Sequence, residues 1–208
     1  MKLLIDTSPR KLKELINEEL VLGQLITPLT KYSDAYLPYG IDNGAFSRFD
    51  KKSFSRIIDR QDHAVDRCLF VAIPDIVGNA RRTLEIWDQR FNFVPPKWPL
   101  ALVAQDGIES LQIPWREMQA IFIGGSTEWK DSRCVVDIVK TAKTLGIHVH
   151  VGRVNTARRF KHFSALGADT CDGSGIARFS HMLEDLKTLI KTPVSPELFD
   201  NVCNEDEC

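Results

Sequence analysis

The chain has 208 residues, which is enough for one domain with a sizeable core and short for two. Apolar residues make up 43% of it, charged residues 26%, and the formal net charge is −1, so no whole-molecule basic field draws it to nucleic acid. No apolar run reaches the ~18 residues of a membrane span, and the apolar part of the N-terminus is too short for a signal peptide. Five widely spaced cysteines without a CxxC pair favour reduced thiols and a cytoplasmic protein, and they give no support for structural zinc.

Short apolar runs alternate with helical patterns along the chain. The predicted strands cover residues 2–7, 24–28, 40–46, 68–74, 99–104, 120–123, 147–151 and 168–171. The first helix is predicted to begin at Ser8 and Pro9, as a cap followed by a first-turn proline. The other predicted helices cover residues 53–67, 78–93, 131–145, 156–166 and 176–190. Eight strand candidates therefore lie between helical segments for most of the chain.

Repeated strand–helix alternation indicates parallel strands, and eight units favour an α/β fold of the compact (β/α)8 TIM-type barrel class. An open doubly wound sheet is the alternative, which periodicity alone does not separate from the barrel. A barrel of 208 residues is near the short end for this fold, so some helices are expected to be abbreviated. We expect one catalytic domain over residues 1–192 and an acidic tail over residues 193–208.

The strand ends carry the residues of chemical interest. In chain order they are Asp42, Asp75, Gln105, Gly124, Gly125, Arg153 and Asp172. In a barrel these ends converge on one mouth. Asp172 lies in the stretch LGADTCDGSG, where a carboxylate at a strand end beside glycines suits a nucleophile or a base; a helix cap is the alternative. Several carboxylates in one mouth raise the pKa of at least one, which suits one ionised nucleophile and one protonated acid.

The neighbouring residues suggest a site for a flat heterocycle. Gln105 offers a donor and an acceptor to the edge of such a ring, and Gly124 with Gly125 is expected to expose backbone N–H groups to it. Phe46, just past Asp42, could stack on the ring. A basic cluster at the seventh strand end suggests nucleic-acid phosphate contacts, with a solvated helix face as the alternative; it comprises Arg153, Arg158, Arg159 and Lys161. His148 and His150 share a strand face without a clear third ligand, so no metal site is predicted.

Six of these fragments occur in an order that resembles the tRNA-guanine transglycosylase superfamily. More narrowly, the chain resembles the small bacteriophage and genomic-island branch, the deazaguanine DNA transglycosylases. The resemblance covers roughly residues 42–175 and rests on DNGAF (42–46), PD (74–75), VAQDG (103–107), FIGG (122–125), VHVGR (149–153) and GADTCDGSG (167–175). Each fragment is weak alone, and the signal comes from six in order, each at a predicted strand end.

The resemblance implies a role for each matching position. Asp172 matches the nucleophile that attacks the sugar C1′ and forms a covalent glycosyl-enzyme, and Asp42 matches the aspartate that transfers protons. The remaining matches are to base-binding positions: Phe46 against the ring, Asp75 and Gln105 on its edge, and Gly125 at the 7-substituent, with Gly124 beside it as a further substrate-binding residue. The implied reaction exchanges guanine in DNA for a free 7-deazaguanine base such as preQ0, without redox cofactor or ATP, in the cytoplasm or the host cytoplasm of a phage.

The chain also departs from the family. The zinc subdomain that follows the nucleophile in the tRNA enzymes is missing, since only Cys203 and Cys208 remain without a matching histidine. Its absence favours DNA over tRNA, by association with the phage branch. The family motif DSGGFQ reads DNGAFS here, which changes the expected base pocket more than the role of Asp42. Three alternatives stay open: tRNA base exchange, a non-catalytic nucleic-acid-binding barrel in a modification complex, and a phosphate-binding metabolic barrel with a lysine or metal in the mouth. The sequence leaves the oligomeric state open.

Overall fold

A computed structural model describes residues 1–6, 21–30, 35, 37–173 and 188 of the chain. Its eight strands are parallel, pair in sequence order and close into a barrel through contacts of β8 with β1. The strands are β1 (Lys2–Ile5), β2 (Val21–Ile26), β3 (Tyr39–Ile41), β4 (Cys68–Ala72), β5 (Leu100–Ala104), β6 (Ala120–Ile123), β7 (His148–Val151) and β8 (Thr170–Cys171). Closure excludes the open sheet and confirms the (β/α)8 TIM-type barrel. The predicted first and last helices and the acidic tail lie outside the described residues.

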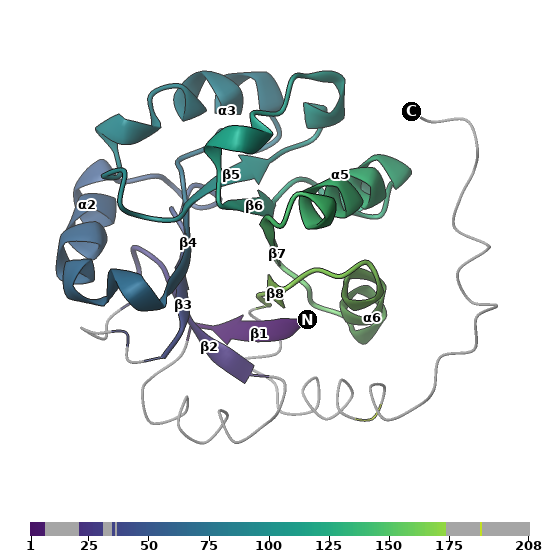
Figure 1. Cartoon of the computed structure of the whole chain (residues 1–208), viewed down its shortest axis with the longest axis horizontal. Helices are drawn as coiled ribbons and strands as arrows, with labels where there is room; N and C mark the ends of the chain where they lie inside the picture. Colours follow the sequence, from purple (N-terminus) through teal and green to yellow (C-terminus); the bar gives the residue numbers. More distant parts are fainter. Residues whose placement is uncertain (7–20, 31–34, 36, 174–187, 189–208) are drawn as a thin grey trace.

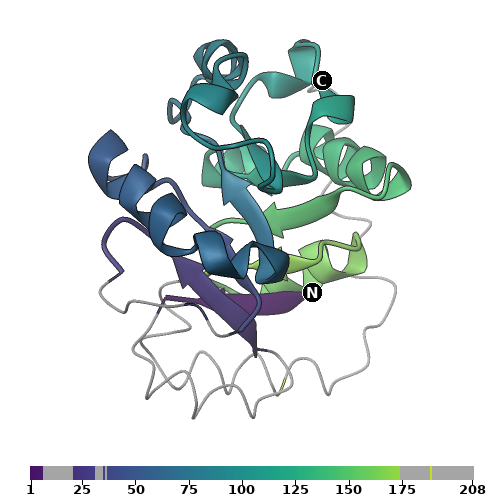
Figure 2. The same ribbon diagram turned by 60° about the vertical axis from the view of Figure 1, so that its left-hand side comes forward.

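The described helices surround the strand ring (Figures 1 and 2). The α-helices are α2 (Lys51–Arg60), α3 (Ala80–Trp87), α4 (Thr127–Lys130), α5 (Arg133–Thr144) and α6 (Ala157–Ala165). Four 3-10 turns complete the set: η1 (Asp62–Arg67), η2 (Arg90–Asn92), η3 (Ile108–Ser110) and η4 (Trp115–Glu117). Only η3 and η4 connect β5 to β6, so the abbreviation expected of a short barrel occurs at this crossover.

One predicted helix is divided in two, and a second one is preceded by a short helix that the pattern did not predict. The pattern over residues 53–67 ends as an α-helix at Arg60, because the buried Gln61 turns inward and its Oε1 accepts the Ala35 N–H at 3.1 Å. The pattern over residues 131–145 corresponds to α5, and the short helix α4 precedes it; Ser126 and Ser132 are the N-cap residues of α4 and α5. Serine is favoured there because its short side chain competes with helical hydrogen bonding.

The core has two layers, separated by the wall of the barrel. Outward-facing strand residues pack against the helices, and inward-facing ones fill the barrel interior. Phe70 and Phe122 occupy much of that interior where β3 and the end of β7 have glycine: a Cβ on Gly40 would lie 2.3 Å from the Phe70 ring, and one on Gly152 would lie 2.6 Å from Phe122. The interior apolar residues come from β1, β2, β4, β5 and β6, whereas β7 and β8 contribute polar ones.

The predictions about membrane spans and cysteine thiols can be compared with the described residues. None of their helices is long and apolar enough to cross a membrane. Cys68 and Cys171 are free thiols, as predicted.

Candidate active site

The strand ends open onto one cavity of about 540 Å³ at the barrel mouth. Most of the residues predicted from the strand ends line it: Asp42, Phe46, Asp75, Gln105, Gly124, Arg153 and Asp172. Gly125, Arg158 and Arg159 do not line it. Sequence reasoning missed several further lining residues, among them Asp6 after β1 and Asn43 after β3. The volume falls in the range of ordinary small-molecule sites.

Asp172 follows β8, and both of its carboxylate oxygens accept hydrogen bonds from the β7 side. Oδ2 lies 3.1 Å from Nε2 of His150, and Oδ1 accepts the backbone N–H of Arg153 at 3.1 Å. Arg153 has a φ of 57°, the only described non-glycine residue with a positive φ. Such backbone strain is held in place only where surrounding contacts determine it, and here it directs an N–H at a carboxylate. The carboxylate is therefore fixed in orientation from two sides.

A buried lysine supports the loop that carries this N–H. Lys130, the last residue of α4, is 1% exposed, and its Nζ donates to the Gly152 carbonyl at 2.8 Å. Burial and the charge of Arg153 lower the pKa of Lys130 to about 8, against a smaller opposing effect of Asp172. Sequence reasoning missed this residue, because it lies in a short helix, seven residues past the end of β6. It does not line the cavity, so it positions the loop rather than meeting a ligand.

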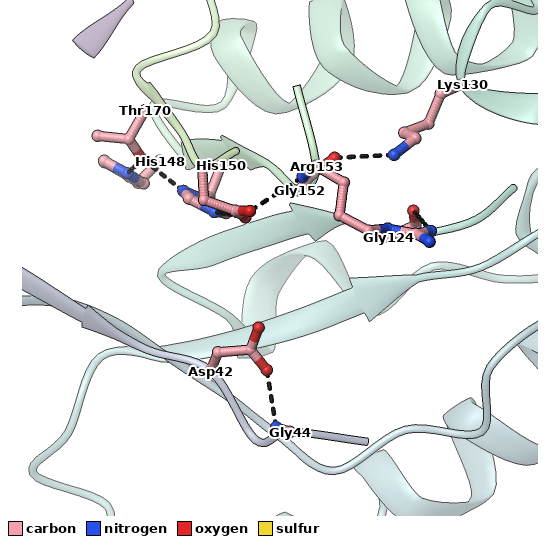
Figure 3. Close-up of polar contacts among 10 residues, drawn as sticks. Asp42, Gly44, Gly124, Lys130, His148, His150, Gly152, Arg153 and Thr170 are labelled. Carbon is pink, nitrogen blue, oxygen red and sulfur yellow. Dashed lines mark hydrogen bonds and ion pairs between the residues drawn. The ribbon is translucent and has the colours of Figure 1, made fainter. Parts of the chain in front are cut away.

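Asp42 follows β3 on the other side of the mouth (Figure 3). Its Oδ1 accepts the Gly44 N–H at 2.7 Å. Burial raises the pKa of Asp42 to about 6, although the Gly44 hydrogen bond opposes the rise. Three nearby carboxylates raise it further: Asp172, Asp75 and Asp6. A carboxyl group with a pKa near 6 can hold a proton and release it close to neutral pH.

Asp75 and Gln105 are bonded to each other inside the mouth. Gln105 Nε2 donates to Asp75 Oδ2 at 2.7 Å, and Gln105 Oε1 accepts the Gly78 N–H at 2.9 Å. Asn43 Nδ2 donates to Asp75 Oδ1 at 2.8 Å and to the Ile73 carbonyl at 2.9 Å. Burial raises the pKa of Asp75 and the two amides lower it in part. The Nε2 and Oε1 atoms of Gln105 each have one partner, which leaves one hydrogen and one lone pair of its amide without a bond named here.

The prediction for the two glycines is wrong in one respect. The N–H groups of Gly124 and Gly125 are not open to a ligand, because both donate to the Ala104 carbonyl, at 3.0 and 3.2 Å. The glycines are needed for close packing instead. A Cβ on Gly124 would lie 2.9 Å from Gln105 Nε2, and one on Gly125 would lie 2.2 Å from the Trp129 ring.

Phe46 and the three predicted phosphate-binding arginines have different surroundings. Phe46 is 67% exposed at the cavity, and the Arg153 guanidinium lies 4.2 Å from its ring centroid. The same guanidinium donates to the Gly125 carbonyl at 2.7 Å, so Arg153 forms part of the wall of the cavity. Arg159 is paired with Asp131 at 2.8 Å, whereas Arg158 is exposed. The basic cluster is therefore spread over three environments and does not form one patch.

The described residues contain no group of three or more His, Cys, Asp or Glu arranged to hold a metal ion. The charged side chains that line the cavity are mostly acidic: Asp6, Asp42, Asp50, Asp75, Asp172, Arg48 and Arg153. Asp6 is held by the hydroxyls of Thr30 at 3.0 Å and Thr27 at 3.3 Å. The cavity thus favours neutral or hydrogen-bond-donating ligand groups over anions near its floor.

No protein-family profile matches the chain, and no curated protein matches it. Among solved structures, the chain is similar to a glycerophosphoryl diester phosphodiesterase from Silicibacter pomeroyi DSS-3, with 14% sequence identity and a TM-score of 0.41. The match covers 74% of this chain, which spans about half (51%) of that protein's length. At this level of similarity, the reaction of that protein is no guide to this one.

Proposed function

We propose that this protein exchanges guanine in DNA for a free 7-deazaguanine base through a covalent aspartyl-glycosyl intermediate. One observation carries the proposal: two carboxylates, Asp42 and Asp172, line one cavity but have different environments. Asp172 is held by hydrogen bonds to both of its oxygens, whereas burial and like charges raise the pKa of Asp42. Pairs of this kind supply the nucleophile and the acid of retaining glycosyl transfer.

In the first half-reaction, an oxygen of ionised Asp172 attacks C1′ of a deoxyguanosine. The C1′–N9 bond breaks, its electron pair goes to the base, and the proton of Asp42 neutralises the departing guanine. The products are a glycosyl ester on Asp172, free guanine and an ionised Asp42. At pH 7 roughly a tenth of Asp42 carries this proton, given its pKa of about 6.

In the second half-reaction, N9 of the 7-deazaguanine attacks C1′ and gives its proton to Asp42. The ester bond breaks, and its electron pair returns Asp172 to the carboxylate. One N-glycosidic bond replaces another of similar energy, so the exchange needs neither a redox cofactor nor a nucleoside triphosphate. The target nucleotide must leave the duplex stack for C1′ to reach Asp172.

Incubation of the purified protein with radiolabelled guanine or preQ0 and either duplex DNA or tRNA tests the proposal. We expect label in DNA, and a protein–DNA adduct that survives denaturation. Asp172→Asn should abolish both, while Asp131→Asn, which removes an exposed carboxylate outside the cavity, should retain both. Label in tRNA alone would overturn the substrate but keep the chemistry. Label in neither polymer, or incorporation that persists in Asp172→Asn, would overturn the proposal.

A further inference from the structure

A hydrogen-bonded chain runs through the barrel interior from Asp172 toward the opposite end of the barrel. His150 Nε2 lies 3.1 Å from Asp172 Oδ2, and His150 Nδ1 lies 2.9 Å from Thr170 Oγ1. The same hydroxyl lies 2.8 Å from Nε2 of His148, the first residue of β7. Figure 3 shows the three side chains grouped around the Thr170 hydroxyl. The mouth is thereby connected to the start of β7.

The rest of the barrel interior is apolar, so the polar atoms of this hydrogen-bonded chain must be paired with one another to be buried there. His150 is 0% exposed, and its ring centroid lies 4.6 Å from those of both Phe70 and Phe122. Barrel interiors are ordinarily filled by branched apolar side chains. A buried imidazole nitrogen without a hydrogen-bond partner destabilises the folded state. Each nitrogen of His150 has one partner, so its place in this interior depends on both.

Among the described residues, the charged groups that we find near the two histidines lie at the two ends of β8 and on α5. At the mouth there is Asp172, and at the other end Asp169 lies 4.0 Å from His148 Nδ1. Asp169 also accepts from Lys143 Nζ of α5 at 2.6 Å and from the Val149 N–H at 2.8 Å. From β4 and β6 the histidines meet only the Phe70 and Phe122 rings. The hydrogen-bonded chain thus has a carboxylate at each end.

If the Thr170 hydroxyl donates to one of the two ring nitrogens, two arrangements satisfy every contact of the chain. An ionised carboxylate can only accept hydrogen bonds. His150 Nε2 therefore carries a hydrogen and donates a hydrogen bond to Asp172. If His150 is neutral, its Nδ1 accepts from Thr170, and Thr170 must then accept from His148 Nε2–H. If His150 is an imidazolium, its Nδ1–H donates to Thr170, which then donates to His148 Nε2, so the His148 proton moves to Nδ1, toward Asp169. The tautomer of His148 therefore reports the charge of His150.

We propose that His150 is a positioning residue for Asp172, and that Thr170 couples the charge of His150 to the tautomer of His148. The role of His150 in catalysis rests on the proposed function. His150 Nε2–H would hold Oδ2 while Asp172 attacks C1′, stay bonded to the ester, and stabilise the carboxylate when the ester bond breaks. The proton stays on His150 Nε2 throughout, so this role consumes no proton and needs no additional reactant. Burial lowers the pKa of His148 to about 4, which keeps that ring neutral near pH 7 and allows a clean tautomer change.

Nuclear magnetic resonance of ¹⁵N-histidine-labelled protein tests the coupling without any substrate. We expect His150 to carry a proton on Nε2 at every pH at which Asp172 is ionised. We also expect the His148 tautomer change to share its pH midpoint with the charging of His150. Single His→Gln variants assign the signals. A His150 whose Nε2 is unprotonated, or a His148 tautomer indifferent to the charge of His150, would overturn the proposal.

Thr170→Val and Thr170→Ser separate the hydroxyl from the shape of the side chain. Valine should uncouple the two histidine transitions, whereas serine should preserve the coupling. Thr83→Val is the matched control, because Thr83 is also buried and hydrogen-bonded through its hydroxyl, but to Asn79 and Ile76 of the β4–α3 segment. It should leave both histidine transitions unchanged. Coupling that survives in Thr170→Val would contradict the role of the hydroxyl. If Thr170→Val does not fold, the comparison of Thr170→Ser with the wild type still tests the coupling.

The base-exchange assay then tests the catalytic part. Thr170→Val should lower kcat by about tenfold and displace its pH profile, with KM for the free base within about twofold, while Thr170→Ser stays near wild type. Coupled histidines in a protein that exchanges no base would support the coupling and overturn the proposed function. Base exchange whose pH profile does not change in Thr170→Val would overturn the positioning role and leave the proposed function standing.

Discussion

The two sides of the barrel mouth hold their carboxylates in different ways. On the β3–β5 side, Asp75 is enclosed by the amides of Asn43 and Gln105, and Asp42 receives a single backbone N–H. On the β7–β8 side, Asp172 is bonded to an imidazole and to the N–H of a strained residue, Arg153. Both sides use aspartates at strand ends, so residue type alone does not distinguish them.

The difference shows how one fold can separate an acid from a nucleophile. Burial without compensating donors raises a carboxyl pKa, whereas hydrogen bonds to the ionised form favour ionisation. Asp42 follows the first rule, with its pKa raised to about 6. Asp172 differs in accepting a hydrogen bond at each carboxylate oxygen. Because β3 and β8 are three strands apart in the ring, a ligand in the cavity can lie between the two groups.

The largest expected effect comes from removing the acid on the β3 side. Asp42→Asn keeps the shape and can still accept the Gly44 N–H, but it cannot give a proton to the departing base. We expect base exchange to fall by about 10²–10⁴-fold, the usual contribution of general acid–base catalysis. Exchange at the wild-type rate, measured by incorporation of labelled base, would show that Asp42 is not the acid.

The same variant should be more stable than the wild type above pH 6. The Asp42 carboxyl ionises near 3.8 when unfolded and near 6 when folded, so its ionisation opposes folding. This penalty is absent below about pH 4, grows between pH 4 and 6, and is constant above; two pKa units correspond to at most about 3 kcal/mol. In urea unfolding, the free energy of unfolding of Asp42→Asn should exceed that of the wild type by about 1–3 kcal/mol at pH 8 and should equal it at pH 4. Equal stability at both values would contradict the raised pKa.

On the β7 side, the buried cation of Lys130 predicts a pH dependence at the other end of the scale. The pKa of this group is about 8 when folded and 10.5 when unfolded, so the cost of burying its charge is present below pH 8 and disappears as pH rises to 10.5. Wild-type stability should therefore gain up to about 3 kcal/mol across this range relative to Lys130→Met. Lys140→Met, on the exposed face of α5, is the control and should match wild type. A Lys130→Met variant with the same pH dependence as wild type would contradict the lowered pKa.

The sequence predicted the fold more completely than the site. Apolar runs and helical patterns located all eight strands, because both signals depend on local spacing. Closure of β8 onto β1 could not be read from periodicity. At the site, Asp42 and Asp172 were found because strand ends are visible in the sequence. Their partners His150 and Lys130 were not assigned, because contacts across the barrel interior or from a following helix depend on three-dimensional packing.

The pair Gly124 and Gly125 shows that a sequence motif does not determine which backbone groups are open to a ligand. A Gly-Gly pair after β6 suggested open N–H groups, but the neighbouring strand end at Ala104 accepts both. The need for glycine there comes from the close approach of Gln105 and Trp129. Asn43 shows the converse: it looked like a departure from a family motif, and it proves to be one of two amides that hold Asp75.

A smaller effect is expected from opening the amide network on the β3–β5 side. Gln105→Leu removes a donor from buried Asp75 and an acceptor from the Gly78 N–H, and should destabilise the fold by about 1–3 kcal/mol. Gln119→Leu is a matched control, because Gln119 also accepts a backbone N–H, from Leu100, but is exposed and does not meet a carboxylate. It should cost no more than about 1 kcal/mol. Equal losses in urea unfolding would mean that Asp75 does not depend on Gln105.

The smallest effect on stability is expected at Phe46, where the two sides of the mouth meet. Its exposed ring touches the Arg153 guanidinium, a contact worth about 0.5–1 kcal/mol at such sites. Phe91→Ala is the control, because Phe91 is also exposed and has the Arg90 guanidinium 4.6 Å from its ring, but lies outside the cavity. Both variants should lose a similar, small unfolding free energy. Only Phe46→Ala should raise KM for the free base, by up to about tenfold, because stacking on a base is lost with the ring. If KM is unchanged, Phe46 closes the mouth by holding Arg153 and does not contact the base.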